Sequence, residues 1–498
     1  MKKSKTIIIY LLTVALIAGI AALICIKVIN SSEKQSANEL FSENTNSTKD
    51  SDDMFTERDL SGSYDKNSAV KINLNNNSSD CNDDSVIISG SKLTVTKENV
   101  YYITGSMTDG QIVIDADDAK VQLVLDSVNI ENKETAAIYV KKAKKVFVTL
   151  ADGTQSTLSV SNEFADAENN KIDSTVYSKD DLVINGTGKL NIVSDYGHAI
   201  AGNDDLKITN GTLNLISAKK AIKANDSVRI ANAEIDIDAG KQGIHCDEDV
   251  YIRSGKININ QCSEGIEGKT ITIDGGTLNI NSEDDGLNAT SSKSSNTDNN
   301  TTTADNKKPF EYDENAQIYI NGGNITINAN GDGIDSNGDL TVCGGNILIY
   351  GAENDGNGAL DFGGKGIING GTVAALGMSG MAVGFDSSSS QCSMLVNFSD
   401  KFSAGIVLTD SSNNVIMSID NSNSYNSAVL SSPDINKGEV YTLKTGNEEE
   451  KIEMTENVYS NASDFKKSPG NGKDRPMKDN PPDGEKPSAP TDNPPEKQ

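Results

Sequence analysis

A segment of about twenty-two residues repeats through the middle of this chain, and it restricts the fold more than any other feature. A small residue followed by Ile or Leu marks each repeat. The pairs are Ala199-Ile200, Ala221-Ile222, Gly243-Ile244, Gly265-Ile266, Gly286-Leu287, Gly333-Ile334 and Ala359-Leu360. Successive pairs are 22, 22, 22, 21, 47 and 26 residues apart, and the interval of 47 contains a polar insert at residues 289–316.

Each repeat contains two short segments in which apolar and polar residues alternate, as in Leu206-Lys207-Ile208 and Leu213-Asn214-Leu215. This alternation is typical of β-strands with one buried face. One coil cannot bury that face alone, so the coils must stack about 4.8 Å apart with Ile aligned on Ile. We therefore predict an all-β fold, a right-handed parallel β-helix with three short sheets and about 22 residues per coil. A leucine-rich repeat is the main alternative, but its Leu-rich consensus and helix pattern are absent.

Solenoids need caps over their open ends, and strand-like segments occur on both sides of the repeats. Residues 86–160 predict less regular coils with N-terminal cap strands, and the segments near 406–417 and 440–443 predict a C-terminal β cap. The predicted β-helix domain covers residues 70–385 and the predicted cap covers residues 386–462. Residues 31–69 have the composition of a disordered stalk, and the Pro- and Lys-rich residues 463–498 that of a disordered tail.

The first thirty residues have the pattern of a membrane segment. A basic start, MKKSK, precedes an uncharged and mostly apolar run at residues 6–26, which is long enough to span a bilayer. We predict a signal anchor over residues 1–30, with a cleaved secretory signal as the alternative. Both interpretations place the rest of the chain outside the cell, and the tail is then a candidate for contact with the cell wall.

The charge of the chain restricts its partners. The sequence has 72 acidic and 44 basic residues and a formal net charge of −28, which argues against a nucleic-acid partner. An excess of carboxylates is suited to binding divalent cations instead.

Polar residues at fixed positions of the repeat should stack into rows. Two residues before each Ile or Leu the row reads His198, Lys220, Gln242, Glu264, Asp285, Asp332; just after it the row reads Ala201, Lys223, His245, Glu267, Asn288, Asp335, Asp361. Carboxylates on successive coils would lie about 5 Å apart and repel one another, a conflict that Ca²⁺ with its oxygen ligands removes. The predicted metal ligands are Glu264, Glu267, Asp284, Asp285, Asn288, Asp332, Asp335, Asp355 and Asp361. Turn formation by Asp-Gly is the simpler alternative.

Outward positions of the strands form further rows, which could make hydrogen bonds along a polysaccharide. The carbohydrate-binding candidates are Lys223, Arg229, Tyr251 and Tyr319. The alternative is that such a row is only the solvated face of a sheet.

Several motifs make the sequence similar to a known family. They are DGQIVIDADD at residues 109–118, AIYVK at 137–141, EDDGLNA at 283–289, GDGIDSNG at 331–338 and NGALD at 357–361. Together they resemble the carbohydrate-binding-domain-containing proteins of clostridia and relatives, over about residues 85–450. The resemblance implies an exported, pectate-lyase-like β-helix that binds calcium and acidic polysaccharide such as polygalacturonate.

These observations predict a non-catalytic cell-surface protein that binds acidic polysaccharide in a calcium-dependent manner. A surface adhesin and a pectate-lyase-like enzyme are the alternatives. A lyase would pair calcium with a Lys or Arg base close to the metal. The arginines of the regular coils, Arg229 and Arg253, both lie outside the acidic rows, so we do not expect catalysis.

Overall fold

The computed structural model describes residues 54–76, 79–165, 171–291 and 312–462. The chain divides into two compact units, residues 1–56 and residues 57–498, and all the elements below belong to the second. The predicted anchor, the tail, most of the stalk and most of the polar insert lie outside the described residues. Within the described ranges, no helix is both long and apolar enough to cross a membrane.

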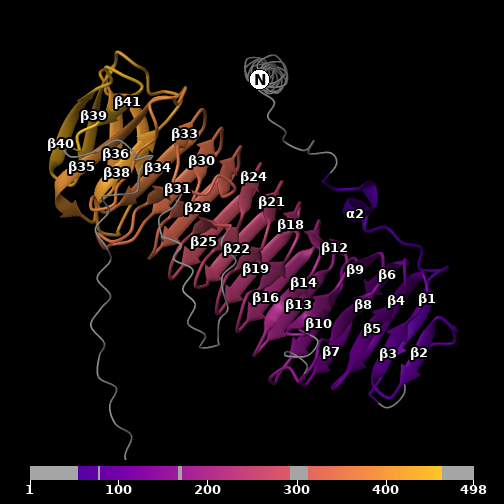
Figure 1. The fold of residues 1–498 in the computed structure, drawn as a ribbon. Helices are drawn as coiled ribbons and strands as arrows, with labels where there is room; N and C mark the ends of the chain where they lie inside the picture. The colour runs from indigo at the N-terminus through magenta and orange to yellow at the C-terminus, as the bar shows by residue number, and fades with distance from the viewer. Residues whose placement is uncertain (1–53, 77–78, 166–170, 292–311, 463–498) are drawn as a thin grey trace, which may run out of the picture. The chain divides into compact units, whose positions relative to one another are not determined.

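The predicted parallel β-solenoid is confirmed, and it has about ten turns of about 24 residues on average (Figure 1). Each coil contributes one strand to each of three faces. Face one contains β2 (Val86–Ser89), β3 (Lys92–Val95), β5 (Gln111–Asp115), β8 (Ile138–Lys142), β11 (Ser174–Ser178), β14 (His198–Gly202), β17 (Ile222–Ala224), β20 (Ile244–Cys246), β23 (Ile266–Gly268), β26 (Leu287–Ala289), β29 (Ile334–Ser336) and β32 (Leu360–Phe362). All neighbours on this face pair in parallel except the antiparallel β2 and β3.

The other two faces belong to one sheet of 25 strands. Face two contains β1 (Val70–Leu74), β4 (Val100–Met107), β6 (Lys120–Leu125), β9 (Lys145–Leu150), β12 (Leu182–Gly186), β15 (Asp205–Ile208), β18 (Ser227–Ile230), β21 (Asp249–Ile252), β24 (Thr270–Ile273), β27 (Gln317–Ile320), β30 (Asp339–Val342) and β33 (Gly366–Ile368). Face three contains β7 (Asn129–Asn132), β10 (Gln155–Val160), β13 (Lys189–Ser194), β16 (Thr212–Ser217), β19 (Glu234–Ala239), β22 (Lys256–Gln261), β25 (Thr277–Ser282), β28 (Asn324–Ala329), β31 (Asn346–Tyr350) and β34 (Thr372–Gly377). Strand β4 joins the two faces because it pairs with both β6 and β7, and it bends at Gly105, whose φ is +92°.

The core is built from aligned aliphatic side chains. Ile200 pairs with Ile222, Ile222 with Ile244 and Ile244 with Ile266, and all four side chains are fully buried. The alignment continues across the polar insert, since Leu287 pairs with Ile334. The long interval in the repeat is therefore one coil that carries an insertion, as the spacing predicts.

The far end of the solenoid is closed by antiparallel strands, as expected. Strand β38 (Tyr425–Ser431) pairs antiparallel with β34 and with β35 (Ser393–Phe402), and β35 pairs in parallel with β41 (Val458–Ser460). A separate sheet has the order β37 (Val415–Ile419), β36 (Ile406–Asp410), β39 (Val440–Thr445) and β40 (Glu448–Glu453).

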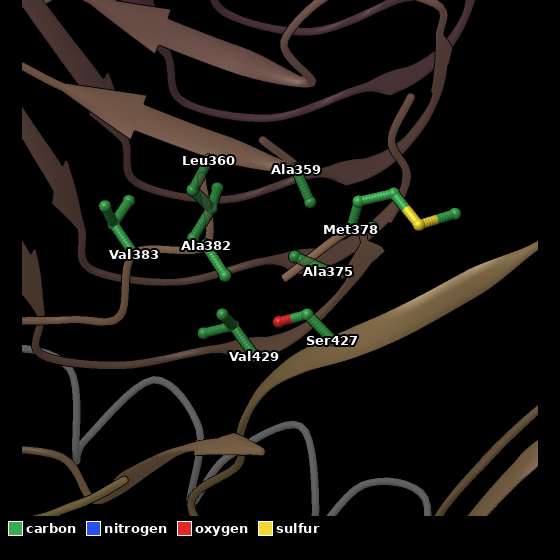
Figure 2. Close-up of a pocket in the computed structure, with 9 residues that line it drawn as sticks. Ala359, Leu360, Ala375, Met378, Ala382, Val383, Ser427 and Val429 are labelled. Carbon is green, nitrogen blue, oxygen red and sulfur yellow. The ribbon is translucent and has the colours of Figure 1, made fainter. Parts of the chain in front are cut away.

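A small cavity lies where the last coil meets these strands (Figure 2). Its lining is almost wholly apolar and includes Leu360, Val383 and Val429, with Ser427 as the polar exception. Its volume of about 10 Å³ corresponds to a single water molecule, so it is not a saccharide pocket.

Candidate metal and carbohydrate site

Face one carries the acidic rows that the repeat predicts. In register, Glu267 pairs with Asn288, Asn288 with Asp335 and Asp335 with Asp361. Asp285 and Asp332 lie in the bends that lead into β26 and β29, two residues before the aligned Leu287 and Ile334. The two rows therefore run side by side across successive coils.

Three of the predicted ligands converge. Asp285, Asp332 and Asp335 each offer one carboxylate oxygen, and these oxygens all lie within 4.8 Å of one another. Backbone N–H groups orient two of the carboxylates. The N–H of Asp332 donates to Oδ1 of Asp285 at 2.7 Å, and the N–H of Gly358 donates to Oδ1 of Asp332 at 2.5 Å. All three side chains are partly buried.

The electrostatics of this cluster disfavour three negative charges. Burial raises the pKa of Asp285 to about 7. The hydrogen bond from the Asp332 N–H lowers this pKa, and the negative charges of Asp284, Asp332 and Glu264 raise it further. Burial and the charge of Glu267 also raise the pKa of Glu264. A divalent cation would relieve this repulsion.

The residues of the cluster fit such a cation. The donor set consists of carboxylate oxygens, which hard cations such as Ca²⁺ prefer. Gly331 keeps the space beside them open, because a Cβ at this position would lie 2.4 Å from Oδ1 of Asp284 and 2.5 Å from Oδ1 of Asp285. Asp285, Asp332 and Asp335 would hold the ion, which supplies a positive charge for an anionic ligand.

The other predicted ligands are not among the described residues whose carboxylate oxygens converge in this cluster. The amide of Asn288 donates to Oε2 of Glu264 at 3.3 Å. Glu267 bonds to Nδ1 of His245 at 2.9 Å. Asp284 and Asp355 are exposed, and Asp361 is the register neighbour of Asp335 on the next coil.

The pairing of Glu267 with His245 is a feature that the row pattern alone does not predict. Nε2 of His245 also lies 3.1 Å from Oδ1 of Asp247, so the ring is held between two carboxylates. Burial opposes a charge on His245, but its hydrogen bonds to Asp247 and Glu267 raise the pKa overall. The same contacts hold the pKa of Glu267 below its usual range despite its burial. The only signal for this pairing in the sequence was that His245 and Glu267 occupy successive positions of one row.

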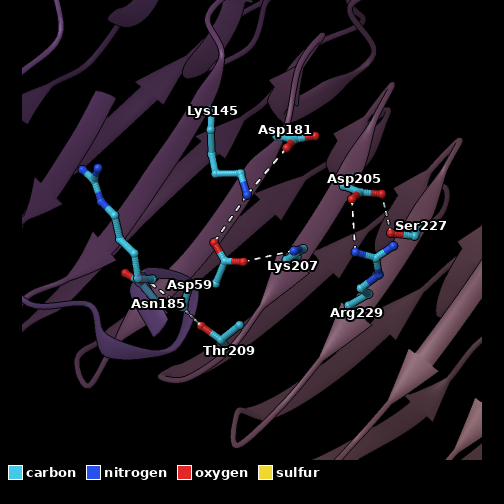
Figure 3. A network of polar contacts seen from close by, with 10 residues as sticks. Asp59, Lys145, Asp181, Asn185, Asp205, Lys207, Thr209, Ser227 and Arg229 are labelled. Carbon is cyan, nitrogen blue, oxygen red and sulfur yellow. Dashed lines mark hydrogen bonds and ion pairs between the residues drawn. The ribbon is translucent and has the colours of Figure 1, made fainter. Parts of the chain in front are cut away.

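The predicted carbohydrate-binding residues do not form one group. Lys223 lies on face one, in β17, whereas Arg229, Tyr251 and Tyr319 lie on face two, in β18, β21 and β27. Nη1 of Arg229 pairs with Oδ2 of Asp205 at 3.2 Å (Figure 3). Tyr251 is 5% exposed and donates to Asp274 at 2.6 Å, whereas Tyr319 is 37% exposed.

Part of face two is covered by a short helix, α2 (Glu57–Ser61), which falls inside the predicted stalk (Figure 3). Its Asp59 is fully buried and pairs with Lys145 at 3.4 Å and with Lys207 at 3.0 Å. The side chain of Asn185 donates to the Asp59 carbonyl at 3.2 Å. Residues 57–61 are thus an ordered part of the solenoid, and the stalk prediction does not hold for them.

The fold and the site together define a parallel β-solenoid with a carboxylate cluster on one face. The chain belongs to the family of carbohydrate-binding domain-containing proteins, whose sequence model matches residues 89–377. This confirms the family that the sequence motifs indicate.

Two proteins illustrate the similarity. A carbohydrate-binding domain-containing protein of Acetivibrio thermocellus is 38% identical over 137 residues, which are 27% of this chain and 48% of that protein. The match therefore spans about half the length of this relative. A solved structure, the gadolinium derivative of the polysaccharide lyase-like protein from C. thermocellum, is 27% identical, with a TM-score of 0.35. That match covers 57% of this chain and 96% of the other.

Proposed function

We propose that this protein binds acidic polysaccharide, without cleaving it, through a Ca²⁺ ion held by Asp285, Asp332 and Asp335. The convergence of these three carboxylates within 4.8 Å is the observation that carries the proposal. Membership in a carbohydrate-binding family supports the class of ligand.

The charge of the chain explains why a cation would be needed. A protein with a net charge of −28 repels a polyuronate, so the sugar carboxylates require a local positive charge for contact. A Ca²⁺ ion bound by the protein keeps free coordination positions and accepts further carboxylate oxygens. Polygalacturonate is therefore the ligand to test first.

A non-catalytic role is favoured over a lyase by the surroundings of the cluster. A lyase needs a base close to the metal-bound sugar. The register neighbours of Asp335 are Asn288 and Asp361, neither of which is a basic side chain. The nearest lysine of the same row as Asp285 is Lys220, three coils away, or about 14 Å at the usual strand spacing.

The experiment is a calcium titration combined with a binding assay. We expect Ca²⁺ to raise the melting temperature and to strengthen the retention of the protein in a gel that contains polygalacturonate. Asp332→Asn should lose both effects, whereas Asp355→Asn, which removes one charge from an exposed position outside the cluster, should keep them. Unchanged melting and binding after chelation would refute the proposal. An increase in absorbance from unsaturated uronides would show a lyase instead.

The proposed location is the cell surface, with the segment at residues 1–30 in the membrane and the tail toward the cell wall. Protease treatment of intact cells should remove the protein from the membrane fraction. Retention of the full-length protein in the cytosol would contradict this location. Attachment to cells that does not depend on glycans would favour the adhesin alternative.

A further inference from the structure

Two lysines on face one lie near acids that are bonded to other groups. Lys220 precedes β17 and is 8% exposed, and Lys223 is partly buried within the same strand. Among the described residues, neither ammonium group has an ion-pair partner within 4.0 Å, and Lys220 bonds to His198 only through its backbone N–H. Lys145 and Lys207, by contrast, share the carboxylate of Asp59.

The acids near these lysines are already engaged. Glu267 and Asp247 both bond to the ring of His245, at 2.9 Å and 3.1 Å. Asp173 lies 3.3 Å from Nε2 of His198. Lys220 is buried and Lys223 is partly buried, and the acids near their ammonium groups are bonded to the histidine rings instead. Burial lowers the pKa of Lys220 to about 8, against the charges of Glu267, Asp247 and Glu264, which raise it.

A buried hydrogen-bond acceptor lies next to Lys220 in the same row. Gln242, one coil further on, is 9% exposed, and its Oε1 is buried without a hydrogen-bond partner among the described residues. A hydrogen bond from the Gln242 side chain helps to lower the pKa of Glu267. The amide nitrogen of Gln242 is therefore the donor to this acid, and the amide oxygen of Gln242 takes no part in the bond. A buried acceptor without a donor is costly, and a ligand hydroxyl would satisfy it.

We propose that Lys220, Lys223 and Gln242 form a second subsite, independent of metal, which binds one uronate residue. A uronate carries on a single ring the two groups that this place lacks, a carboxylate for the lysines and a hydroxyl for Oε1 of Gln242. This inference rests on the proposed function, because it assigns a further contact to the same acidic polysaccharide.

The subsite also fixes how the polymer lies on the solenoid. Lys220 and Asp285 belong to one row, three coils apart, which corresponds to about 14 Å along the stacking direction. One sugar cannot reach both positions, so a chain that contacts both crosses the coils along the solenoid axis. It then follows face one instead of running along a single strand.

The experiment measures the binding of a galacturonate oligomer of about six residues by calorimetry, in Ca²⁺ and in EDTA. Lys220→Gln should weaken binding about tenfold in both conditions, as expected for the loss of one charge-assisted hydrogen bond. Its Ca²⁺ affinity without saccharide should equal that of the wild type. Asp332→Asn should show the opposite result, with Ca²⁺ binding lost and the residual binding in EDTA retained.

Lys241→Gln is the matched control, since Lys241 is an exposed lysine next to Gln242 and the charge change is the same. It should bind the oligomer like the wild type. Equal affinity of Lys220→Gln and the wild type, or an equal loss in Lys241→Gln, would overturn the subsite. Should Lys220→Gln fail to fold, Lys223→Gln at the partly buried neighbour gives the same test. Binding in EDTA without any effect of Ca²⁺ would refute the metal site and leave the subsite standing.

Discussion

The backbone N–H of Asp332 donates a hydrogen bond to the carboxylate of Asp285 at 2.7 Å, although 47 residues separate them in the chain. The contact exists because Leu287 and Ile334 are register neighbours, which places the bends that precede them side by side. Two acids from successive coils thus approach each other through the regularity of the stack and not through a local motif.

Asp285→Asn should abolish stabilisation by calcium. Ca²⁺ at about 100 times its dissociation constant is expected to add about 2.7 kcal/mol to the free energy of unfolding of the wild type, because it binds only the folded state. The variant should gain nothing from the ion, while its stability in EDTA rises above that of the wild type because one repelling charge is gone. Thermal melting with and without Ca²⁺ measures both effects, and a variant that still responds to Ca²⁺ would contradict the site.

His245→Gln should change how stability depends on pH. The pKa of His245 is raised above its ordinary value of 6.5 in the folded protein, so the stabilisation is complete below pH 6.5 and is lost as the pH rises through the folded pKa. Urea denaturation at pH values of about 6 and 8 should therefore show a loss in the wild type that is smaller in the variant.

His198 is the control for His245, because its effect on the pH dependence of stability has the opposite sign. Burial lowers the pKa of His198 despite its contact with Asp173, so this residue stabilises the fold above pH 6.5 and the effect is lost as the pH falls. His198→Gln should thus change the slope of the free energy of unfolding against pH in the direction opposite to His245→Gln. Identical slopes for both variants would rule out the assigned contacts.

Asp59→Ala should destabilise the N-terminal coils by about 3–5 kcal/mol, because it removes the buried carboxylate that Lys145 and Lys207 share. Glu234→Ala breaks the exposed pair with Lys256 and should cost less than about 1 kcal/mol. Chemical denaturation compares the two variants. Equal costs would show that α2 is not held by this ion pair.

Ile244→Ala should cost about 2–5 kcal/mol in the free energy of unfolding, since the side chain is fully buried between Ile222 and Ile266. Ile216→Ala, at a position that is 43% exposed, should cost less than about 1 kcal/mol. A small effect at Ile244 would mean that the stacked row does not carry the core.

The aliphatic rows were predictable because their period is short and constant. Once Ile222, Ile244 and Ile266 are aligned, the face on which each neighbouring residue lies follows directly. The meeting of Asp285, Asp332 and Asp335 follows from the same alignment. The class of fold and the approximate place of the acidic cluster are therefore readable from the residues.

The sequence did not predict which neighbouring side chain each carboxylate of a row bonds to. Glu267 occupies a position equivalent to that of Asp335, yet it bonds to His245, because an imidazole one coil away competes for its carboxylate. The docking of α2 was missed for a different reason. Its five residues have no repeat, and their anchors Lys145 and Lys207 lie 86 and 148 residues further along the chain.

The 47-residue separation of Asp285 and Asp332 has a consequence for folding. The other intervals of the repeat are 21 to 26 residues long, and closing a segment of 47 residues instead of 22 costs about 0.7 kcal/mol more in chain entropy. A cation shared by the two aspartates would offset that cost, because it would link the coils on the two sides of the insert. Cation binding would then tie the stability of the coils beyond the insert to that of the coils before it, which already pair through β26 and β29.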